Sequence, residues 1–229
     1  MKKLLVCFLV LVMATGLLTS CTKDGEYELS GGVKILLDDK SITEVSGTGA
    51  DTVKIRRKNI KVLMEMEDGG SFVMELYPEY APKTVRNFCD LVYEGFYDGL
   101  TFHRIVPGFV AQAGDPTATG TGGSKDKIKG EFESNGYKNN TLKHEKGVVS
   151  MARTNEPNSA TSQFFICLED NDTLDGEYAA FGKVVYGFDI VDSMAQVAVD
   201  ENCKPFVDVI IKKASIISDA EYKKITEEK

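Results

Sequence analysis

The stretch between Thr101 and Gly123 gathers most of the side chains in this chain that could do chemistry. It sets His103 beside Arg104, places Gln112 eight residues further on, and ends in a run rich in Gly and Thr. Two short segments of alternating apolar residues flank the pair Pro107-Gly108, a pattern typical of a hairpin. The stretch therefore predicts two strands with polar side chains on one face, followed by a loop.

Nucleophilic catalysis and phosphate binding are the first chemistries that these residues suggest. The chain has only two histidines, His103 and His144, and neither comes with a Gly-x-Ser-x-Gly elbow or a Cys-His signature. A lone histidine in a strand is more often structural than catalytic. The run Gly120–Lys125 lacks the Gly-Lys-Ser/Thr ending of a phosphate-binding loop. The residues alone therefore predict neither a nucleophile nor a nucleotide site.

What remains is a surface made of one arginine, several amides and apolar rings. Alternation along a strand puts every second side chain on the same face. The expected pairs that share a face are Arg104 with Phe102, Val110 with Gln112, Gln163 with Phe165, and Phe164 with Ile166. The pattern leaves open whether this surface binds a ligand or consists of solvated amides over a core.

Many short strands and two isolated helices surround these residues. Helical spacing and punctuation predict helices between Pro82 and Gly95 and between Gly187 and Gln196. Outside the hairpin, strands are expected over 60–66, 71–77, 147–152, 162–168, 181–185 and within 206–217, where Val207, Val209 and Ile211 alternate. This order favours an antiparallel sheet curled into a barrel or sandwich, with helices over its open ends.

Composition limits the classes of protein and partner. An apolar content of 42% and a charged content of 27% are ordinary for a globular domain. The formal charge is −8, and without residues 1–20, which hold two lysines and no acid, 25 basic residues face 35 acidic ones, a net −10. Nucleic-acid binding needs basic surface, so no nucleic-acid partner is predicted.

The N-terminus reads as a targeting segment. Lys2-Lys3 precede the apolar run Leu4–Leu18, which is shorter than a membrane span and is predicted to be a cleaved signal peptide over residues 1–20. Leu18-Thr-Ser-Cys21 resembles the lipobox of bacterial lipoproteins, which implies lipidation of Cys21 and anchoring to a membrane of the cell envelope. A polar tether over 21–58, with at most a short strand at 33–37, and a charged tail over 219–229 are expected to flank the domain at 59–218.

The other cysteines predict no disulfide framework and no metal site. Cys89, Cys167 and Cys203 are widely spaced and form no Cys-x-x-Cys pair. Cys89 and Cys167 fall within apolar patterns, so both are expected to be buried free thiols.

The motifs, taken together, resemble the cyclophilins, the peptidyl-prolyl cis-trans isomerases. The signature segments are Phe102-His-Arg-Ile-Val-Pro-Gly-Phe-Val-Ala-Gln-Ala-Gly-Asp115 and Ser162-Gln-Phe-Phe-Ile-Cys167, and further matches run in the family's order from about residue 60 to 217. The resemblance implies a closed eight-stranded antiparallel β-barrel capped by two α-helices. It also implies a monomer that rotates X-Pro peptide bonds in proline-containing polypeptides without cofactor or metal.

The resemblance also implies roles for individual residues. Arg104 would be catalytic, because a guanidinium can donate a hydrogen bond to the lone pair of the twisted proline nitrogen. His103 would support the groove without acting as a base, and Gln112 would help to position Arg104. The remaining groove residues would bind substrate: Phe109, Val110, Phe165 and Leu174 around the proline, and Ala152, Arg153, Gln163 and Tyr178 beside it.

Two departures from the family pattern affect ligand binding. Thr173 aligns with the family's pocket-edge tryptophan, so only weak cyclosporin binding is expected, and Tyr178 aligns with its groove histidine. Neither change touches Arg104, so activity on exported proteins is predicted to persist. The alternative that the sequence leaves open is a proline-peptide-binding or holdase module with little turnover.

Overall fold

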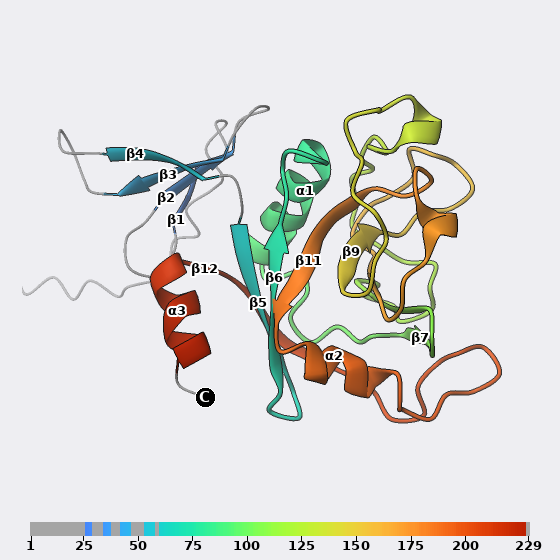
Figure 1. Ribbon diagram of the computed structural model, residues 1–229. Coiled ribbons are helices and arrows are strands. Elements are labelled where there is room, and N and C mark those ends of the chain that lie inside the picture. Colours follow the sequence, from blue (N-terminus) through green and yellow to red (C-terminus); the bar gives the residue numbers. More distant parts are fainter. Residues whose placement is uncertain (1–25, 29–33, 38–41, 47–52, 58–59, 228–229) are drawn as a thin grey trace, which may run out of the picture.

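The computed structural model describes residues 26–28, 34–37, 42–46, 53–57 and 60–227 (Figure 1). The predicted signal peptide and the predicted lipidation site Cys21 lie outside the described residues. In the segment predicted to be a tether, four short strands form an antiparallel sheet in the order β1-β2-β3-β4: β1 (Glu26–Glu28), β2 (Lys34–Leu37), β3 (Ile42–Ser46) and β4 (Val53–Arg57). The sequence indicated only the second, because strands of three to five residues give a weak periodic signal.

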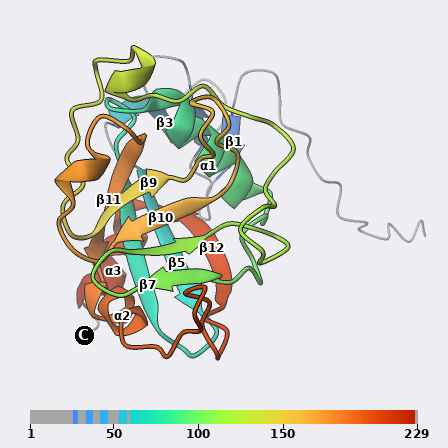
Figure 2. The same cartoon turned by 90° about the vertical axis from the view of Figure 1, so that its right-hand side faces the viewer.

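The main sheet has eight antiparallel strands in the order β12-β5-β6-β11-β9-β10-β8-β7. Figures 1 and 2 show how strongly the sheet curls. The strands are β5 (Ile60–Met66), β6 (Ser71–Leu76), β7 (Arg104–Val106), β8 (Val110–Ala113), β9 (Val148–Met151), β10 (Phe164–Cys167), β11 (Ala180–Tyr186) and β12 (Ile211–Ile217). The predicted antiparallel β architecture is confirmed.

The sheet is open where the sequence predicted a closed barrel. Within the part of the chain that the structure describes, the ladder ends at β7 and β12, which do not pair. The loops beside these strands meet instead, through an isolated bridge between Thr101 and Ile210 and a 2.8 Å hydrogen bond from the Phe102 amide to the Val209 carbonyl. The Ile105 amide of β7 donates to the Cys203 carbonyl at 2.8 Å, so the outer edge of β7 faces the loop before β12 and not β12 itself.

The last strand begins later than its apolar alternation indicated. β12 starts at Ile211, and Val207, expected to alternate inward, is 78% exposed in the preceding loop. An isolated bridge between Val199 and Pro205 folds the chain back on itself just before this point. The alternating apolar pattern therefore begins several residues before the strand itself.

Two helices cover the ends of the curled sheet, as predicted, and a third follows it. α1 (Pro82–Tyr93) and α2 (Phe188–Met194) lie at its two ends in Figure 2. The apolar stripe of α1, including Val85, Phe88 and Val92, is buried. α3 (Asp219–Glu227) occupies the predicted charged tail, where the Ser218 amide and hydroxyl donate to Glu221 at 2.8 Å as a capping box.

The N-terminus of α1 is satisfied from a distant part of the chain. Ala81 precedes the helix and offers no side-chain cap. Glu131, 2% exposed, accepts hydrogen bonds from the amides of Lys83 (3.1 Å) and Thr84 (2.8 Å) and from the Thr84 hydroxyl (2.8 Å). A buried carboxylate at this end of a helix satisfies otherwise unpaired amides and meets the positive end of the helix dipole.

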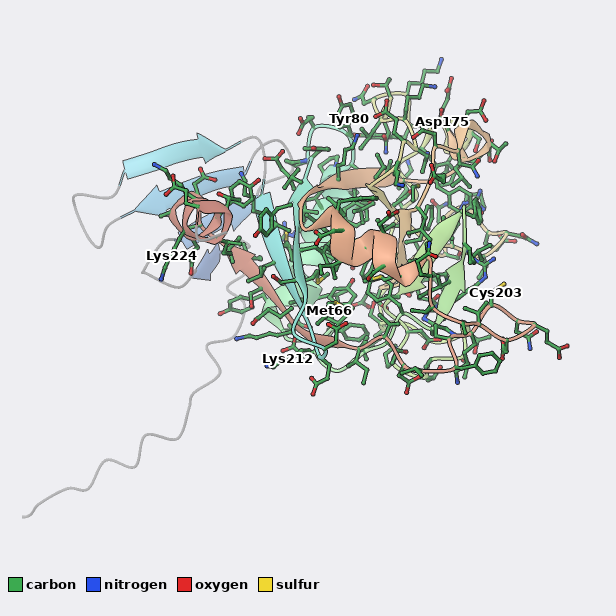
Figure 3. The ribbon with its side chains drawn as sticks, turned by 60° about the horizontal axis from the view of Figure 1, so that its bottom comes forward. Met66, Tyr80, Asp175, Cys203, Lys212 and Lys224 are labelled. Carbon is green, nitrogen blue, oxygen red and sulfur yellow. The ribbon has the colours of Figure 1, made fainter. Side chains whose placement is uncertain are left out.

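Apolar side chains form two separate clusters on the two faces of the sheet. The larger one fills the curl and includes Phe88, Phe102, Phe164 and Phe181. The smaller one, called the outer cluster here, comprises Val110, Val148, Phe165, Cys167, Leu174 and Ala180, with Phe109, Leu142, Ala152 and Tyr178 packed at its edge. Figure 3 sets α3, marked by Lys224, and the loop that carries Asp175 on opposite sides of the domain.

Candidate active site

A small pocket of about 110 Å³ opens on the outer cluster. Nine of the eleven residues that the sequence predicted for the groove line it, and they come from five separate segments. They are Arg104, Phe109, Val110, Gln112, Ala152, Arg153, Phe165, Leu174 and Tyr178. Gln163 lines an adjoining pocket and His103 lines neither.

Strand register brings these residues together. Arg104 pairs with Gln112 across β7 and β8, and Gln112 pairs in turn with Phe165 across β8 and β10. Within β10, Phe164 belongs to the main core while Phe165 belongs to the outer cluster. The predicted alternation along this strand is therefore confirmed. Each phenylalanine is buried, but in a different apolar cluster.

The prediction that Phe102 and Arg104 share a face is wrong. Phe102 is fully buried in the main core, whereas Arg104 is half-buried at the rim of the small pocket. β7 begins only at Arg104, so Phe102 lies outside the region where strand alternation applies.

The wall of the small pocket is mainly apolar. Phe165 is 5% exposed and meets Tyr178 edge-to-face, with ring centroids 5.6 Å apart at 84°. Val110 and Leu174 are also buried, and Phe109 and Ala152 close the sides. A space of this size and lining suits a compact apolar ring.

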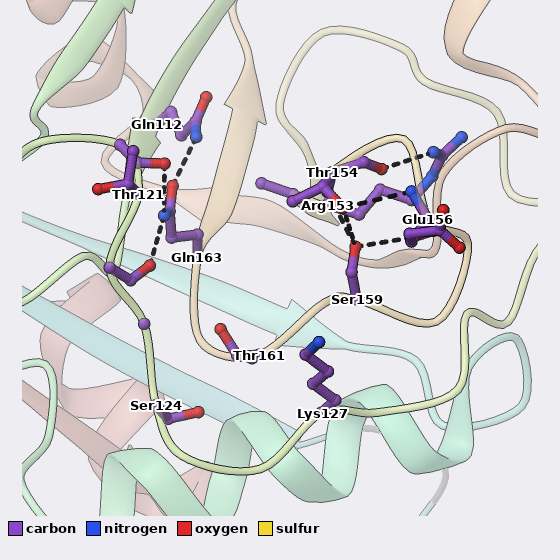
Figure 4. A pocket seen from close by; sticks show the side chains of 14 residues that line it. Gln112, Thr121, Ser124, Lys127, Arg153, Thr154, Glu156, Ser159, Thr161 and Gln163 are labelled. Atoms are coloured by element: carbon purple, nitrogen blue, oxygen red, sulfur yellow. Dashed lines mark hydrogen bonds between the residues drawn. The ribbon is translucent and has the colours of Figure 1, made fainter.

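A row of amides runs from Arg104 along the groove. Arg104 Nη1 donates to Gln112 Oε1 at 3.5 Å, Gln112 Nε2 donates to Gln163 Oε1 at 2.7 Å, and Gln163 Nε2 donates to the carbonyls of Gly122 (2.7 Å) and Gly120 (3.1 Å). Figure 4 shows the central link between the two glutamines. The long first bond engages one of the five N–H groups of the guanidinium, so the others can reach a ligand in the small pocket.

A large pocket of about 420 Å³ adjoins the small one and shares Gln112, Ala152 and Arg153 with it (Figure 4). The Gly/Thr-rich loop forms one of its walls, and Lys127, Glu156 and Ser159 are among its lining residues. No motif in the sequence indicated a role for Lys127, Glu156 or Ser159. The only indication in the sequence that these residues could line a binding site was the length and polarity of the segments that carry them.

Asp115 holds the Gly/Thr-rich loop that forms a wall of the large pocket. Its carboxylate, 1% exposed, accepts from the amides of Thr117 (2.8 Å), Thr119 (3.1 Å), Gly120 (2.7 Å) and Gly122 (3.0 Å). Burial alone would raise the pKa of this carboxyl group, but the donors around it outweigh burial and lower the pKa to about 2. The carbonyls of Gly120 and Gly122 are the same ones that orient Gln163.

His103 and Arg153 take supporting positions. His103 is buried beside the loop, and burial lowers its pKa while the charge of Asp115 opposes that change. The guanidinium of Arg153 lies over the rings of Tyr178 (4.7 Å) and Phe132 (5.0 Å), and its Nη2 donates to the Glu177 carbonyl at 2.9 Å. The Arg153 side chain is thus committed to the pocket wall.

Potential metal ligands and free thiols lie apart in the described part of the chain. No group of three His, Cys, Asp or Glu side chains there could hold a metal ion. Cys89 and Cys167 are buried free thiols, as predicted, and Cys203 is a partly exposed one. None of the helices in these residues is both long and apolar enough to cross a bilayer.

Comparisons with known proteins agree with the resemblance. A family model described as cyclophilin type peptidyl-prolyl cis-trans isomerase/CLD matches residues 61–216. Peptidyl-prolyl cis-trans isomerase B of Bacillus subtilis is 48% identical over 130 residues, 57% of this chain and 87% of that protein. Peptidyl-prolyl cis-trans isomerase-like 1 of Aspergillus fumigatus is 44% identical over 154 residues, 66% of this chain and 92% of that protein.

Solved structures give the same result. A crystal structure of a Cryptosporidium parvum cyclophilin type peptidyl-prolyl cis-trans isomerase superposes with a TM-score of 0.64 and 33% identity, covering 70% of this chain and 98% of that one. A second crystal structure of that protein, in the presence of the dipeptide Ala-Pro, gives a TM-score of 0.63 and 34% identity, with coverage of 69% and 99%. Since the matched region contains both pockets, this chain belongs to the cyclophilin-type peptidyl-prolyl cis-trans isomerase family and is a peptidyl-prolyl cis-trans isomerase.

Proposed function

We propose that the small pocket binds the proline ring of a polypeptide and that Arg104 catalyses rotation about the preceding peptide bond. The observation that carries this proposal is the guanidinium at the rim of an apolar pocket, beside the Gln112 amide. Rotation breaks no bond, so it needs no nucleophile. It needs a donor that prefers the twisted state, in which the proline nitrogen keeps its lone pair.

Energies decide how much Arg104 contributes. The barrier to rotation is about 20 kcal/mol, and a 10⁵-fold acceleration corresponds to about 7 kcal/mol. One hydrogen bond to a charged group contributes about 1.5–3 kcal/mol. The remainder comes from holding the substrate in a reactive orientation, which the small pocket and the row of amides support.

The test replaces Arg104 and measures turnover and binding separately. We expect Arg104→Ala to lower kcat/KM on an Ala-Pro peptide by about 10- to 150-fold, the equivalent of 1.5–3 kcal/mol. The dissociation constant of the same peptide should change by less than about threefold, because the apolar lining is intact. Arg104→Lys should recover only part of the rate, since lysine lacks the planar fork of donors.

Arg86→Ala is the matched control, because Arg86 lies on α1 and lines neither pocket. It should leave turnover unchanged. If Arg104→Ala kept full turnover, or lost turnover and peptide binding in equal measure, Arg104 would not be the catalytic residue.

A second candidate function is a proline-peptide-binding or holdase module in which turnover is incidental. The large pocket next to the small one supports it, because together they offer room for a longer peptide segment. The discriminating measurement is turnover by the unaltered protein. Peptide binding without measurable turnover would favour this alternative over catalysis.

We further propose that the protein is lipid-anchored in the bacterial envelope and acts as a monomer on exported proteins. The support is the sequence Leu18-Thr-Ser-Cys21 after an apolar run. A Cys21→Ser variant should move from the membrane fraction to the soluble fraction and lose incorporated fatty acid. Retention of that variant in the membrane would refute the anchor, and protease treatment of intact cells would report which face carries the domain.

A further inference from the structure

A buried side-chain array lies directly behind the small pocket. His144, fully enclosed, has its Nδ1 3.1 Å from Asp175 Oδ1 and its Nε2 3.0 Å from Ser150 Oγ. The backbone amide of His144 donates to the same carboxylate oxygen at 2.8 Å. The hydrogen bonds link serine to histidine and histidine to aspartate, as in a hydrolase triad. Ser150 has no exposed surface, however, so no substrate can reach its hydroxyl.

The hydrogen bonds assign one tautomer to the imidazole. Burial alone would raise the pKa of Asp175, but bonds from His144 and Lys143 outweigh it and lower the pKa, so the carboxylate has no proton to donate. Nδ1 must therefore carry the hydrogen, and Nε2 accepts from the Ser150 hydroxyl. Burial lowers the pKa of His144, which keeps the ring neutral in this arrangement.

His144 contacts two parts of the wall of the small pocket: the ring of Phe165 and the turn that carries Leu174. Its ring stacks on Phe165, with centroids 6.1 Å apart and planes 20° from parallel. Its backbone carbonyl accepts from the amide of Asn171 at 2.8 Å, and its amide and ring hold Asp175. Asn171 and Asp175 bracket the turn that carries Leu174, so His144 fixes both ends of that turn.

We infer that His144 is a positioning residue for proline binding. It sets the distance between Phe165 and Leu174, the two rigid walls that enclose the substrate ring, and takes no part in the rotation itself. The inference rests on the proposed binding of proline in the small pocket. It adds a residue that the groove assignment did not include and that lines neither pocket.

The kinetic consequence differs from that of Arg104. The walls contact the proline ring in the ground state and in the twisted state alike, so displacing them weakens both equally. We expect KM to rise about tenfold in His144→Phe, which keeps a ring against Phe165 but lacks both ring hydrogen bonds, while kcat changes less than about threefold. Ser150→Ala removes one partner only and should raise KM about two- to fivefold.

Lys143→Gln is the matched control. Lys143 precedes His144 in the chain and pairs with the same carboxylate, 3.1 Å from Asp175 Oδ2, but its side chain is exposed. Because the Lys143 ammonium is held at the solvent-exposed side of Asp175, this pair contributes little. The control should therefore leave KM, kcat and unfolding unchanged.

The tautomer gives a readout that is taken on the unaltered protein and does not depend on kinetics. The chain has two histidines, so ¹⁵N spectra of the imidazoles can be assigned with one substitution. His144 should show a protonated Nδ1 and an unprotonated Nε2 at neutral pH. The opposite tautomer in the unaltered protein would overturn the inference.

The remaining outcomes are equally decisive. A raised KM with retained kcat in folded His144→Phe or Ser150→Ala supports the inference. Loss of active protein or of thermal stability with unchanged KM would reduce His144 to a structural residue and overturn it. If the unaltered protein showed no turnover, the proposed catalysis would fail, while the Ala-Pro dissociation constants of the same variants would still decide the role of His144.

Discussion

Asp115→Asn is the most informative single change, because it keeps the shape of the side chain and removes its charge. Three backbone amides converge on Asp115 Oδ2, those of Thr119, Gly120 and Gly122, at 2.7–3.1 Å. Asparagine has one oxygen in place of two. Whichever way its amide is turned, an NH₂ group then faces N–H donors, and several of those donors lose their acceptor.

The size of the effect can be approached in two ways, both of which count the same hydrogen bonds to Asp115. A buried donor left without an acceptor costs about 1–3 kcal/mol, and solvent can reach part of this loop. Lowering a pKa from 3.8 to about 2 corresponds to about 2–3 kcal/mol at about 1.4 kcal/mol per unit. We therefore expect Asp115→Asn to lower the free energy of unfolding by about 2–4 kcal/mol at pH 7, or on the order of 10 °C in Tm.

The pH dependence follows from the sign of the shift. The pKa of Asp115 is lower in the folded state than in the unfolded state, so its stabilisation is complete above about pH 4. It is lost as pH falls from about 4 to about 2, where the folded-state carboxylate takes up a proton. The difference between the unaltered protein and Asp115→Asn should therefore shrink over that range.

Urea unfolding at a series of pH values, followed by circular dichroism, measures both effects. Asp126→Asn is the control, since Asp126 is an exposed aspartate further along the same loop region. Equal stability of Asp115→Asn and the unaltered protein at pH 7 would refute the reasoning. So would a difference that stays constant down to pH 2.5.

Three further predictions concern other parts of the domain. Glu131→Gln should lower the free energy of unfolding by about 1–2 kcal/mol in urea titrations, because an amide is a poorer partner for the N-terminus of α1; an unchanged midpoint would contradict the cap. A thiol reagent at pH 8, with sites read by mass spectrometry, should modify Cys203 well before Cys89 and Cys167, since burial raises the pKa of both, to about 12 for Cys167; faster labelling of either buried thiol would count against this burial. Cyclosporin should bind weakly and Thr173→Trp should tighten it by about tenfold or more, as followed by calorimetry; nanomolar affinity of the unaltered protein would refute this.

Local patterns were sufficient to predict the part of the fold that lies within single elements. The apolar stripe of α1 and the alternation of Phe164 and Phe165 in β10 both follow from the period of the element, and both are found. Local patterns failed where an element ended. Phe102 precedes β7 and Val207 precedes β12, so alternation misplaced both.

The candidate active site, too, could be predicted only in part from the sequence. Groove residues inside the signature segments could be predicted because the family resemblance carries them. The interactions that hold them could not, because their partners are distant in sequence: Glu131 lies 47 residues from Thr84, and His144 lies 31 residues from Asp175. No local period or spacing indicates which buried polar groups will meet across such separations.

The pairing of β5 with β12 has a consequence for how the domain comes to be folded. Lys61 and Ile217 are register partners, so the first and last strands of the main sheet join across a sequence separation of 156 residues. Closing a loop of that length costs about 4–5 kcal/mol of chain entropy before any contact repays it. A ribosome must release the whole sheet before β5 gains its outer neighbour, so until then Val62 and Met64 have one strand beside them instead of two. Folding of this isomerase is therefore expected to be late and slow, and a chain stopped before Ile211 should expose a strand edge that invites aggregation.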